Sequence, residues 1–471
     1  AQAAYDAQPR ASGAALCGAA MFGRWLRRWP SDIRCLLLAN FLVSTLTAIA
    51  QGAIFDAYLL VLSGGSNTFV GTVESARGLA VLAVAMPIGC IADRWSKVKV
   101  VRWNAALGVV FVAFLALGVP LNSVPLIMAG SILSGIHNQC LMGTMPAVLA
   151  EMTSAGDQRT KAISDMATSR SLGMAIGPLM QLLLALALGS QGWSATELHW
   201  VICSGLLLFA PYALLVWFMF PGRDQRAVAG PGPLTAELTE AKAGQAAGDL
   251  PLRTEAAGAT GTSAGPEPAV QATAPEPPLA QAAGATTLRH WLVAVLLEIC
   301  SVCTTLGSGM TFKFWPLFFK GDFGFSPAGV CAVQFMTWLS VAACAQVMPL
   351  VARRIGRLPT VIMSFYIGTG LLFLISRKAP VVPTLLMVLV RNAVMNGGTP
   401  IIQAVVVDMV PQQHRGKWGA IASLKRSSWS GSAFVGGELS DSHDYRFAFF
   451  ITACVHSGAG LFLFPAAALL P

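Results

Sequence analysis

The feature that most constrains this chain is a succession of long apolar stretches separated by short polar loops. An α-helix rises 1.5 Å per residue, so about 20 residues cross the ~30 Å hydrocarbon core of a bilayer. Composition agrees, because 55% of the residues are hydrophobic and only 11% are charged, too few to cover a water-facing surface. The sequence therefore predicts twelve membrane-spanning helices, at residues 35–60, 69–91, 100–119, 124–149, 162–188, 199–220, 291–318, 326–351, 358–376, 381–409, 417–437 and 446–470.

A segment of different composition divides these twelve stretches into two sets of six. It is rich in Ala, Pro, Gly, Glu and Thr and cannot bury enough apolar surface to fold alone. The predicted fold is an all-α membrane protein with twelve transmembrane helices arranged as two pseudo-symmetric six-helix bundles. The regions are a disordered basic tail at 1–34, a bundle at 35–220, a disordered cytoplasmic linker at 221–288 and a bundle at 289–471.

The basic residues predict the orientation in the membrane. The chain has a formal net charge of +9, but its basic residues fall in short clusters between apolar runs. This is a topology signal and not the basic patch of a nucleic-acid binder. The loops at 61–68 and 120–123 carry almost no basic residues, and Arg377 and Lys378 are an exception to the pattern. Both termini are therefore predicted to be cytoplasmic, on the side of Arg94, Lys97, Lys99, Arg102, Arg159, Lys161, Arg353, Arg354 and Arg357.

The sequence offers no constellation typical of catalysis or metal binding. Cys300 and Cys303 form a CxxC inside an apolar helix, but no second pair accompanies them, so plain helix packing is favoured. No HExxH motif and no phosphate-cradling glycine motif occurs in the sequence. We predict no enzyme, no metal site and no cofactor.

The loop after the second predicted helix reads Gly89-Cys-Ile-Ala-Asp93-Arg94-Trp-Ser96-Lys97. It resembles the signature of the major facilitator superfamily, with Ser96 where that family usually has Gly. The corresponding loop of the second half keeps basic residues at Arg353, Arg354 and Arg357 but lacks the Asp. The resemblance implies the two-bundle fold and a cytoplasmic latch formed by these residues, in which Asp93 contacts the start of the eleventh helix around Gly416–Trp418.

A second resemblance bears on the kind of transport. Gly173-Met-Ala-Ile-Gly177-Pro178 is similar to part of the motif of drug–proton antiporters, although the flanking glycines of that motif are missing. Glycines at i and i+4 also let two helices approach closely, a need that other proteins share. Proton antiport and helix packing both remain open.

Ionisable residues at membrane depth are costly, so they mark candidate functional sites. Glu74 and Arg77 lie three residues apart on one helix face and form either a structural pair or a proton-accepting site. Arg170, Arg391 and Arg426 lie near the predicted midplane. They either line a positive cavity for a carboxylate or phosphate, or neutralise buried acids such as Glu298, Asp165 and Glu74.

Three further polar residues have two interpretations each. His137 is either a packing residue of the fourth helix or a proton relay. Asp56 and Lys313, near the outer ends of the first and seventh helices, either form a gate between the halves or extend to the membrane interface. The candidate substrate and proton site comprises Glu74, Arg77, His137, Arg170, Glu298, Arg391 and Arg426.

These residues predict a secondary active transporter that works by rocker-switch alternating access around a midplane site. The arginines favour a small anionic organic solute, and protons are the predicted coupling ion. The alternatives are a drug– or metabolite–proton antiporter and a receptor built on the same scaffold. The expected partners are the solute, the proton and the lipid bilayer, with no nucleic acid, and the chain is expected to be a monomer.

Overall fold

The structure is a computed structural model that describes residues 25–95, 97–153, 157–187, 189, 192–219, 283–409 and 415–469. We call residues 25–219 the first half and residues 287–469 the second half. By their contacts, both halves belong to one compact unit.

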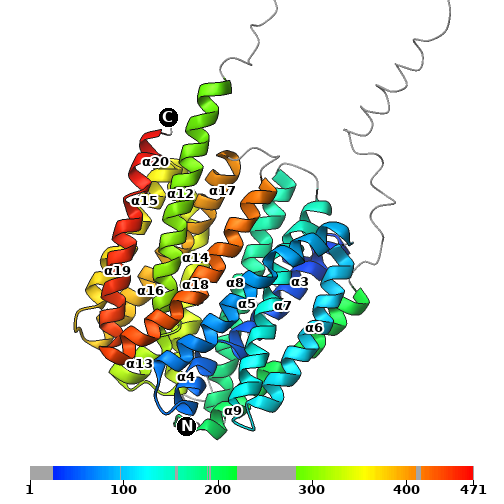
Figure 1. The fold of residues 1–471 in the computed structure, drawn as a ribbon, viewed down its shortest axis with the longest axis vertical. Helices are drawn as coiled ribbons and strands as arrows, with labels where there is room; N and C mark the ends of the chain where they lie inside the picture. The colour runs from blue at the N-terminus through cyan, green and yellow to red at the C-terminus, as the bar shows by residue number, and fades with distance from the viewer. Residues whose placement is uncertain are drawn as a thin grey trace, which may run out of the picture. The chain divides into compact units, whose positions relative to one another are not determined.

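The described residues of the first half form a series of helices (Figure 1). Most are long, and several are interrupted by a short break. Their bounds are α3 Ser31–Ala50, α4 Ala53–Leu62, α5 Asn67–Arg94, α6 Lys97–Gly118, α7 Val124–Glu151, α8 Asp157–Ala187, α9 Ala195–Leu206, α10 Phe209–Leu214 and the π-helix η1 Leu215–Met219.

The second half repeats this organisation. Its helices are α12 Ala283–Phe312, α13 Trp315–Phe323, α14 Pro327–Ile355, α15 Arg357–Ile375, α16 Val381–Gly397, α17 Thr399–Met409, α18 Arg415–Ser442, α19 Tyr445–Gly460 and α20 Leu463–Leu469.

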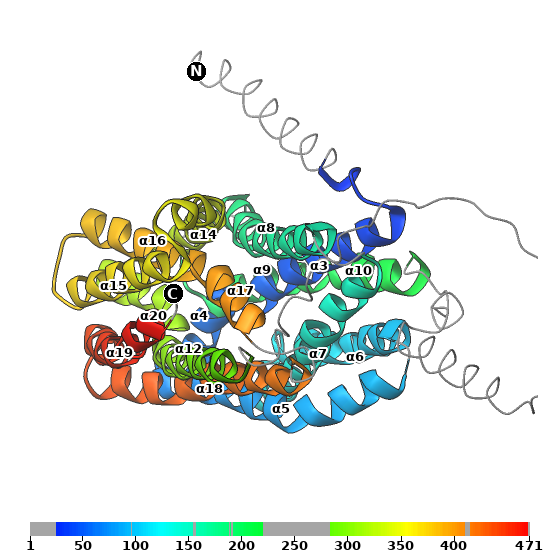
Figure 2. The same ribbon diagram turned by 90° about the horizontal axis from the view of Figure 1, so that it is seen from above.

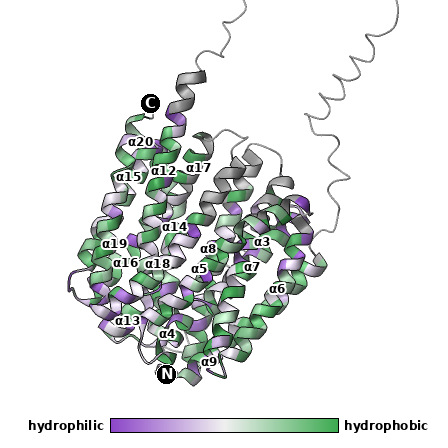
Figure 3. Cartoon of the chain, in the orientation of Figure 1, coloured by the Kyte–Doolittle hydropathy of each residue, from purple (hydrophilic) through white to green (hydrophobic). Residues whose placement is uncertain are grey.

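Each of the twelve predicted spans coincides with one helix or with helices in series. Among the described residues, nine stretches are long and apolar enough to cross a membrane. The other three predicted spans correspond to α7, to α16 with α17, and to α18. Figure 3 shows hydrophobic residues predominating along α6 and α12.

The first helix of each half is broken at an equivalent place, whereas the apolar pattern predicts continuous helices. The break between α3 and α4 falls at Gln51 and Gly52, and Gly52 takes an extended conformation as the N-cap of α4. Glycine is favoured at such a cap and is a poor helix former. The break between α12 and α13 falls at Lys313 and Phe314, just before Pro316, which lacks an N–H and starts a new helix.

The two halves meet along two helix pairs. α5 packs against α18, and α8 packs against α14 (Figure 2). The α5–α18 contact is close because α5 presents Gly71, where a Cβ would overlap the backbone carbonyl of Ala433. Ser75 of α5 donates its hydroxyl to the backbone oxygen of Gly431 at 3.0 Å. Small residues that let backbones approach in this way are typical of helix contacts in membranes.

Candidate substrate cavity and closed end

A cavity of about 860 Å³ lies between the two halves. Residues of α3, α4, α5, α7 and α8 line it from the first half, and residues of each helix from α12 to α18 line it from the second. This volume falls within the range of small-molecule sites, about 300–1,000 Å³.

The cavity is strongly basic. Among the described lining residues, two are acidic, Asp56 and Glu298. Glu74, next to the lining, adds a third acid because it pairs with Arg77. Six basic residues therefore face three acids, which leaves an excess of positive charge in the cavity. The basic lining residues are Arg77, Arg170, Lys313, Arg391, Lys425 and Arg426.

The three arginines singled out from the sequence all line this cavity. Arg391 is 5% exposed, donates from Nη1 to Asn392 Oδ1 at 2.9 Å, and holds its guanidinium 5.7 Å from the ring centroid of Trp315. Its Nε has no hydrogen-bond partner within the described part of the chain. Arg426 hydrogen-bonds Gln139 across the halves.

The acids that could have neutralised these arginines have other partners. Glu298 pairs with Lys425 at 2.7 Å. Asp165 accepts hydrogen bonds from the indoles of Trp25 and Trp29 at 3.2 and 2.8 Å. Across the described ranges, no carboxylate contacts Arg170, Arg391 or Arg426.

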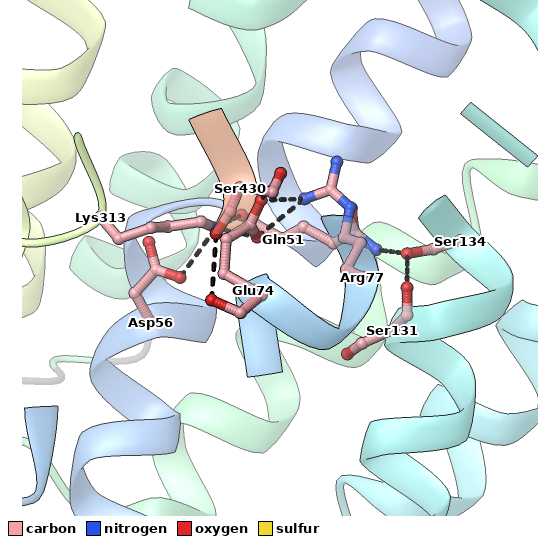
Figure 4. A network of polar contacts seen from close by, with 9 residues as sticks. Gln51, Asp56, Glu74, Arg77, Ser131, Ser134, Lys313 and Ser430 are labelled. Atoms are coloured by element: carbon pink, nitrogen blue, oxygen red, sulfur yellow. Dashed lines mark hydrogen bonds and ion pairs between the residues drawn. The ribbon is translucent and has the colours of Figure 1, made fainter. Parts of the chain in front are cut away.

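A second cluster of charges borders the cavity, and Figure 4 shows its polar contacts. Glu74 and Arg77 form the pair predicted from their i, i+3 spacing, at 3.0 Å. Lys313 of the second half reaches Asp56 at 3.0 Å and Glu74 at 3.4 Å. Of the two interpretations of Asp56 and Lys313, the structure therefore has the contact between the halves. Ser430 of α18 donates to Glu74 Oε1 at 2.8 Å. We call Asp56, Glu74, Arg77 and Lys313 the ionic network.

The broken helices make the ionic network feasible. Lys313 lies in the break after α12, and its ammonium donates to the backbone oxygen of Gln51, in the break after α3, at 3.1 Å. Asp56, Glu74 and Lys313 are each at most 5% exposed. Two acids and two bases balance each other, which is how buried charges persist in a low-dielectric interior.

Beyond the ionic network, Asp441 at the C-terminal end of α18 holds the N-terminus of α5. Its carboxylate accepts hydrogen bonds from the backbone N–H groups of Asn67 and Thr68, at 2.9 and 2.8 Å. It also accepts from Asn67 Nδ2 at 2.8 Å and from Thr68 Oγ1 at 2.7 Å. An acid is favoured there because the orphan N–H groups and the helix dipole are positive.

Further contacts join the halves at the same level. Tyr445 donates its hydroxyl to Asn67 Oδ1 at 2.8 Å. The Trp193 indole donates to the backbone oxygen of Phe325 at 3.1 Å, and Lys320 lies 4.9 Å from the Trp193 ring centroid. We call this end of the helices, including the ionic network and Asp441, the closed end.

Replacing Asp441 by Asn should loosen the closed end. Burial alone would raise the pKa of Asp441, but the hydrogen bonds from Thr68 and Asn67 outweigh it and hold the pKa below its usual range. The bonds therefore favour the carboxylate, so their contribution is present at neutral pH and is lost as pH falls through the lowered pKa. We expect Asp441→Asn to increase the distance between spin labels at Leu121→Cys and Val382→Cys, measured in a background without native cysteines. Asp444→Asn, which removes a nearby negative charge but keeps a local helix cap, is the control, and equal distances in both variants would contradict the assignment.

His137 lies apart from the cavity lining. It is buried among Phe111, Phe209 and Tyr212, with ring centroids 5.1 to 6.1 Å away. This aromatic environment favours the interpretation of His137 as a packing residue.

The predicted cytoplasmic latch is described only in part. Gly89 and Asp93 fall in the last turns of α5, and Arg94, Arg353, Arg354 and Arg357 are exposed. The side chains of Asp93, Lys97 and residues 416–418 lie outside the described residues, as does their predicted contact.

Sequence reasoning missed several residues that the structure places at these sites. Ser430, Gln51 and Asp441 hold the ionic network or the closed end. His456 of α19 is fully buried and lies within 3.3 Å of Ser308 Oγ, beside the cavity. Uncharged residues and a helix-end acid carry no distinctive signal in a single sequence.

A set of long apolar helices in two halves around a charged central cavity defines a multi-pass helical membrane transporter. The chain matches the model of the Major Facilitator Superfamily over residues 36–292 and 297–469. It belongs to that family, whose signature its second loop resembles.

Solved structures confirm the fold. A mutant of the nucleoside transporter NupG aligns with a TM-score of 0.64 and 14% identity, covering 93% of this chain and 100% of that one. A D-xylose–proton symporter aligns with a TM-score of 0.65 and 15% identity, covering 92% and 96%. The human organic anion transporter MFSD10 aligns with a TM-score of 0.59 and 16% identity, covering 92% and 100%. No curated protein sequence matches this chain significantly.

Proposed function

We propose that this member of the superfamily is a secondary active transporter of a small anionic organic solute, coupled to protons. The observation that carries the proposal is the basic cavity, in which Arg170, Arg391 and Arg426 contact no carboxylate among the described residues. Unpaired positive charge at membrane depth is costly, and an anionic substrate would relieve it.

We propose alternating access between the two ends of the helices. The contacts at the closed end must break for the cavity to open there, and the halves then approach at the opposite end. The closed end includes the nearly uncharged loop at 63–66, so the positive-inside rule places it away from the cytoplasm. In this orientation the structure is the inward-facing state and both termini are cytoplasmic.

The helix pair α5–α18 has one carboxylate near each of its two ends, and each carboxylate lies on one helix and faces the N-terminus of the other in this proposal. Asp441 of α18 holds the N-terminus of α5 at the closed end. Asp93, in the last turn of α5, is proposed to hold the N-terminus of α18 at the cytoplasmic end once the cavity has opened outward. The two contacts would then stabilise opposite states of one cycle.

Asp93→Asn should slow turnover and leave substrate affinity largely intact, because the latch favours one state without touching the substrate. Initial rates and KM of counterflow in proteoliposomes measure both quantities. Asp157→Asn, at the start of α8, is the matched control. Transport by Asp93→Asn at the normal rate would remove the latch from the mechanism.

Protons are proposed to couple through the ionic network, where Glu74 and Asp56 are exchangeable partners of Lys313. Protonation of either acid would remove one of the two negative charges that hold Lys313 and so loosen the closed end, which links proton binding to opening.

The decisive experiment is counterflow in proteoliposomes that hold the purified full chain. A transporter exchanges internal and external anion, whereas a receptor binds the anion without flux. An inward or outward pH gradient should change the direction of net uptake. Binding of anions without any flux would exclude the proposed function, and flux that ignores the pH gradient would exclude proton coupling.

The antiporter alternative gains no specific support from the fifth helix. A Cβ at Gly173 would crowd the Phe41 carbonyl oxygen and Ser44 of α3, and one at Gly177 would crowd Ala48. Close packing of α8 on α3 therefore accounts for both glycines.

A further inference from the structure

One wall of the cavity, contributed entirely by the second half, combines aromatic rings with side-chain amides. It draws on four helices, α12, α14, α16 and α18. We call it the amide–aromatic wall, and its residues are Phe312, Gln334, Trp338, Asn392, Asn396 and Trp429.

The rings of this wall give the cavity an aromatic surface on which a flat group can stack. Phe312 and Trp429 lie with ring centroids 4.9 Å apart, and the Trp338 indole faces the same cavity from α14. Aromatic side chains contribute large contact area and prefer stacked or edge-to-face partners. An aliphatic ligand can fill the same contact area, but it cannot stack on the rings.

The amides have unused hydrogen-bonding groups. Gln334 makes no hydrogen bond with the described residues, and Asn396 uses its Nδ2 on the Asn392 backbone oxygen at 2.9 Å while its Oδ1 stays open. Polar groups at membrane depth require water or a polar ligand. Amides next to aromatic faces are the combination that binds the edge of a heteroaromatic ring by hydrogen bonds while its face stacks.

The positive charge lies within reach of the same wall. Arg426 precedes Trp429 by three residues on α18, which places their Cβ atoms about 5–6 Å apart on one helix face. Arg391 directly precedes Asn392 on α16, is nine-tenths buried, and has an unpartnered Nε. A ring on the wall and an anionic group on these arginines therefore fit one small molecule.

We infer that the transported anion is a planar heteroaromatic acid whose charged group is attached to the ring or a bond or two away. Its ring stacks on the amide–aromatic wall, Gln334 and Asn396 hydrogen-bond the ring edge, and Arg426 or Arg391 binds the anionic group. The inference rests on the proposed function and specifies its substrate class.

The test is inhibition and counterflow in proteoliposomes of the full chain with three carboxylates of similar size. Pyridine-3-carboxylate has the ring, the edge acceptor and the charge, benzoate lacks the edge acceptor, and cyclohexanecarboxylate lacks the flat ring. We expect half-maximal concentrations to rise by about threefold to tenfold at each step, which is the usual effect of one neutral hydrogen bond or one aromatic pair. Pyridine-3-carboxamide, which lacks the charge, should be the weakest.

Two variants separate the ring face from the ring edge. Trp338→Leu should abolish the advantage of benzoate over cyclohexanecarboxylate, and Gln334→Leu should abolish only the advantage of pyridine-3-carboxylate over benzoate. Trp200→Leu, at a 68% exposed position on α9, is the control and should preserve both. Equal transport of the three carboxylates overturns the inference and leaves the proposed function standing. If none of the three carboxylates is transported, and aliphatic dicarboxylates and phosphate esters give no flux either, both the inference and the proposed function are overturned.

Discussion

Counterflow of the anionic substrate should fall by about tenfold to a hundredfold in kcat/KM when Arg426 is replaced by Gln. A hydrogen bond to a charged group contributes about 1.5–3 kcal/mol, which corresponds to that range of rates. Arg426→Gln keeps a polar, though shorter, side chain on the face of α18 that meets Gln139, so the loss of the charge is the main change. Arg426→Lys should retain part of the activity, because it keeps the charge but not the planar fork that matches a carboxylate.

Arg170 and Arg391 extend this prediction. Each contacts no carboxylate in the described ranges, so its replacement by Gln removes positive charge without leaving a described acid unpaired. Arg377→Gln, an exposed loop position outside the cavity, is the matched control. Normal transport by Arg170→Ala, Arg391→Ala and Arg426→Ala at normal expression would show that the arginines do not bind the substrate.

The membrane spans follow from the sequence because lipid imposes a length and a composition on any helix that crosses it. Local spacing is equally reliable, and the pair of Glu74 and Arg77 follows from three residues on one helix face. The positions of Arg170, Arg391 and Arg426 on the cavity wall follow from the cost of leaving charge in lipid. Each of these inferences uses information contained in a single helix.

The interactions between the halves are a different matter, because they depend on tertiary packing. Lys313 lies 257 residues from Asp56 in the chain, and its reach depends on two helix breaks that the apolar pattern conceals. From the sequence alone, Asp441 is an ordinary solvated acid at a helix end. Its role depends on the contact with α5, which only the tertiary structure shows. The sequence makes Glu298 a candidate partner for an arginine. In the structure Glu298 instead pairs with Lys425 of another helix.

These contacts between the halves explain how noncovalent interactions alone keep the cavity closed at one end. One contact of the ionic network, that of Glu74 with Ser430, joins the same helix pair as Asp441, because Ser430 and Asp441 both belong to α18 and Glu74 and Asn67 both belong to α5. Opening therefore requires the loss of charged contacts at two depths together. A proton that neutralises Glu74 weakens the deeper one, which is why the network is the proposed coupling site.

Lys313→Met should destabilise the closed end by about 3–5 kcal/mol, the usual result of removing one partner from a buried ion pair. The variant leaves Asp56 and Glu74 buried with Arg77 as their remaining base in the ionic network, at side-chain exposures of about 6% for both acids. In detergent we expect a lower Tm, and spin labels at Leu121→Cys and Val382→Cys should report a longer distance across the closed end. Lys378→Met, at an exposed loop position, should change neither measurement.

The double variant Asp56→Asn with Lys313→Met decides between charge balance and simple loss of packing. It restores equal numbers of acids and bases, since Glu74 keeps Arg77 at 3.0 Å and Ser430 at 2.8 Å. If Lys313 acts by balancing charge, the double variant should regain most of the lost Tm and the short label distance, with a coupling free energy well above the roughly 0.5 kcal/mol expected of independent sites. Effects that merely add would mean that the lysine stem holds the closed end by packing, and that proton coupling must be sought elsewhere in the cavity.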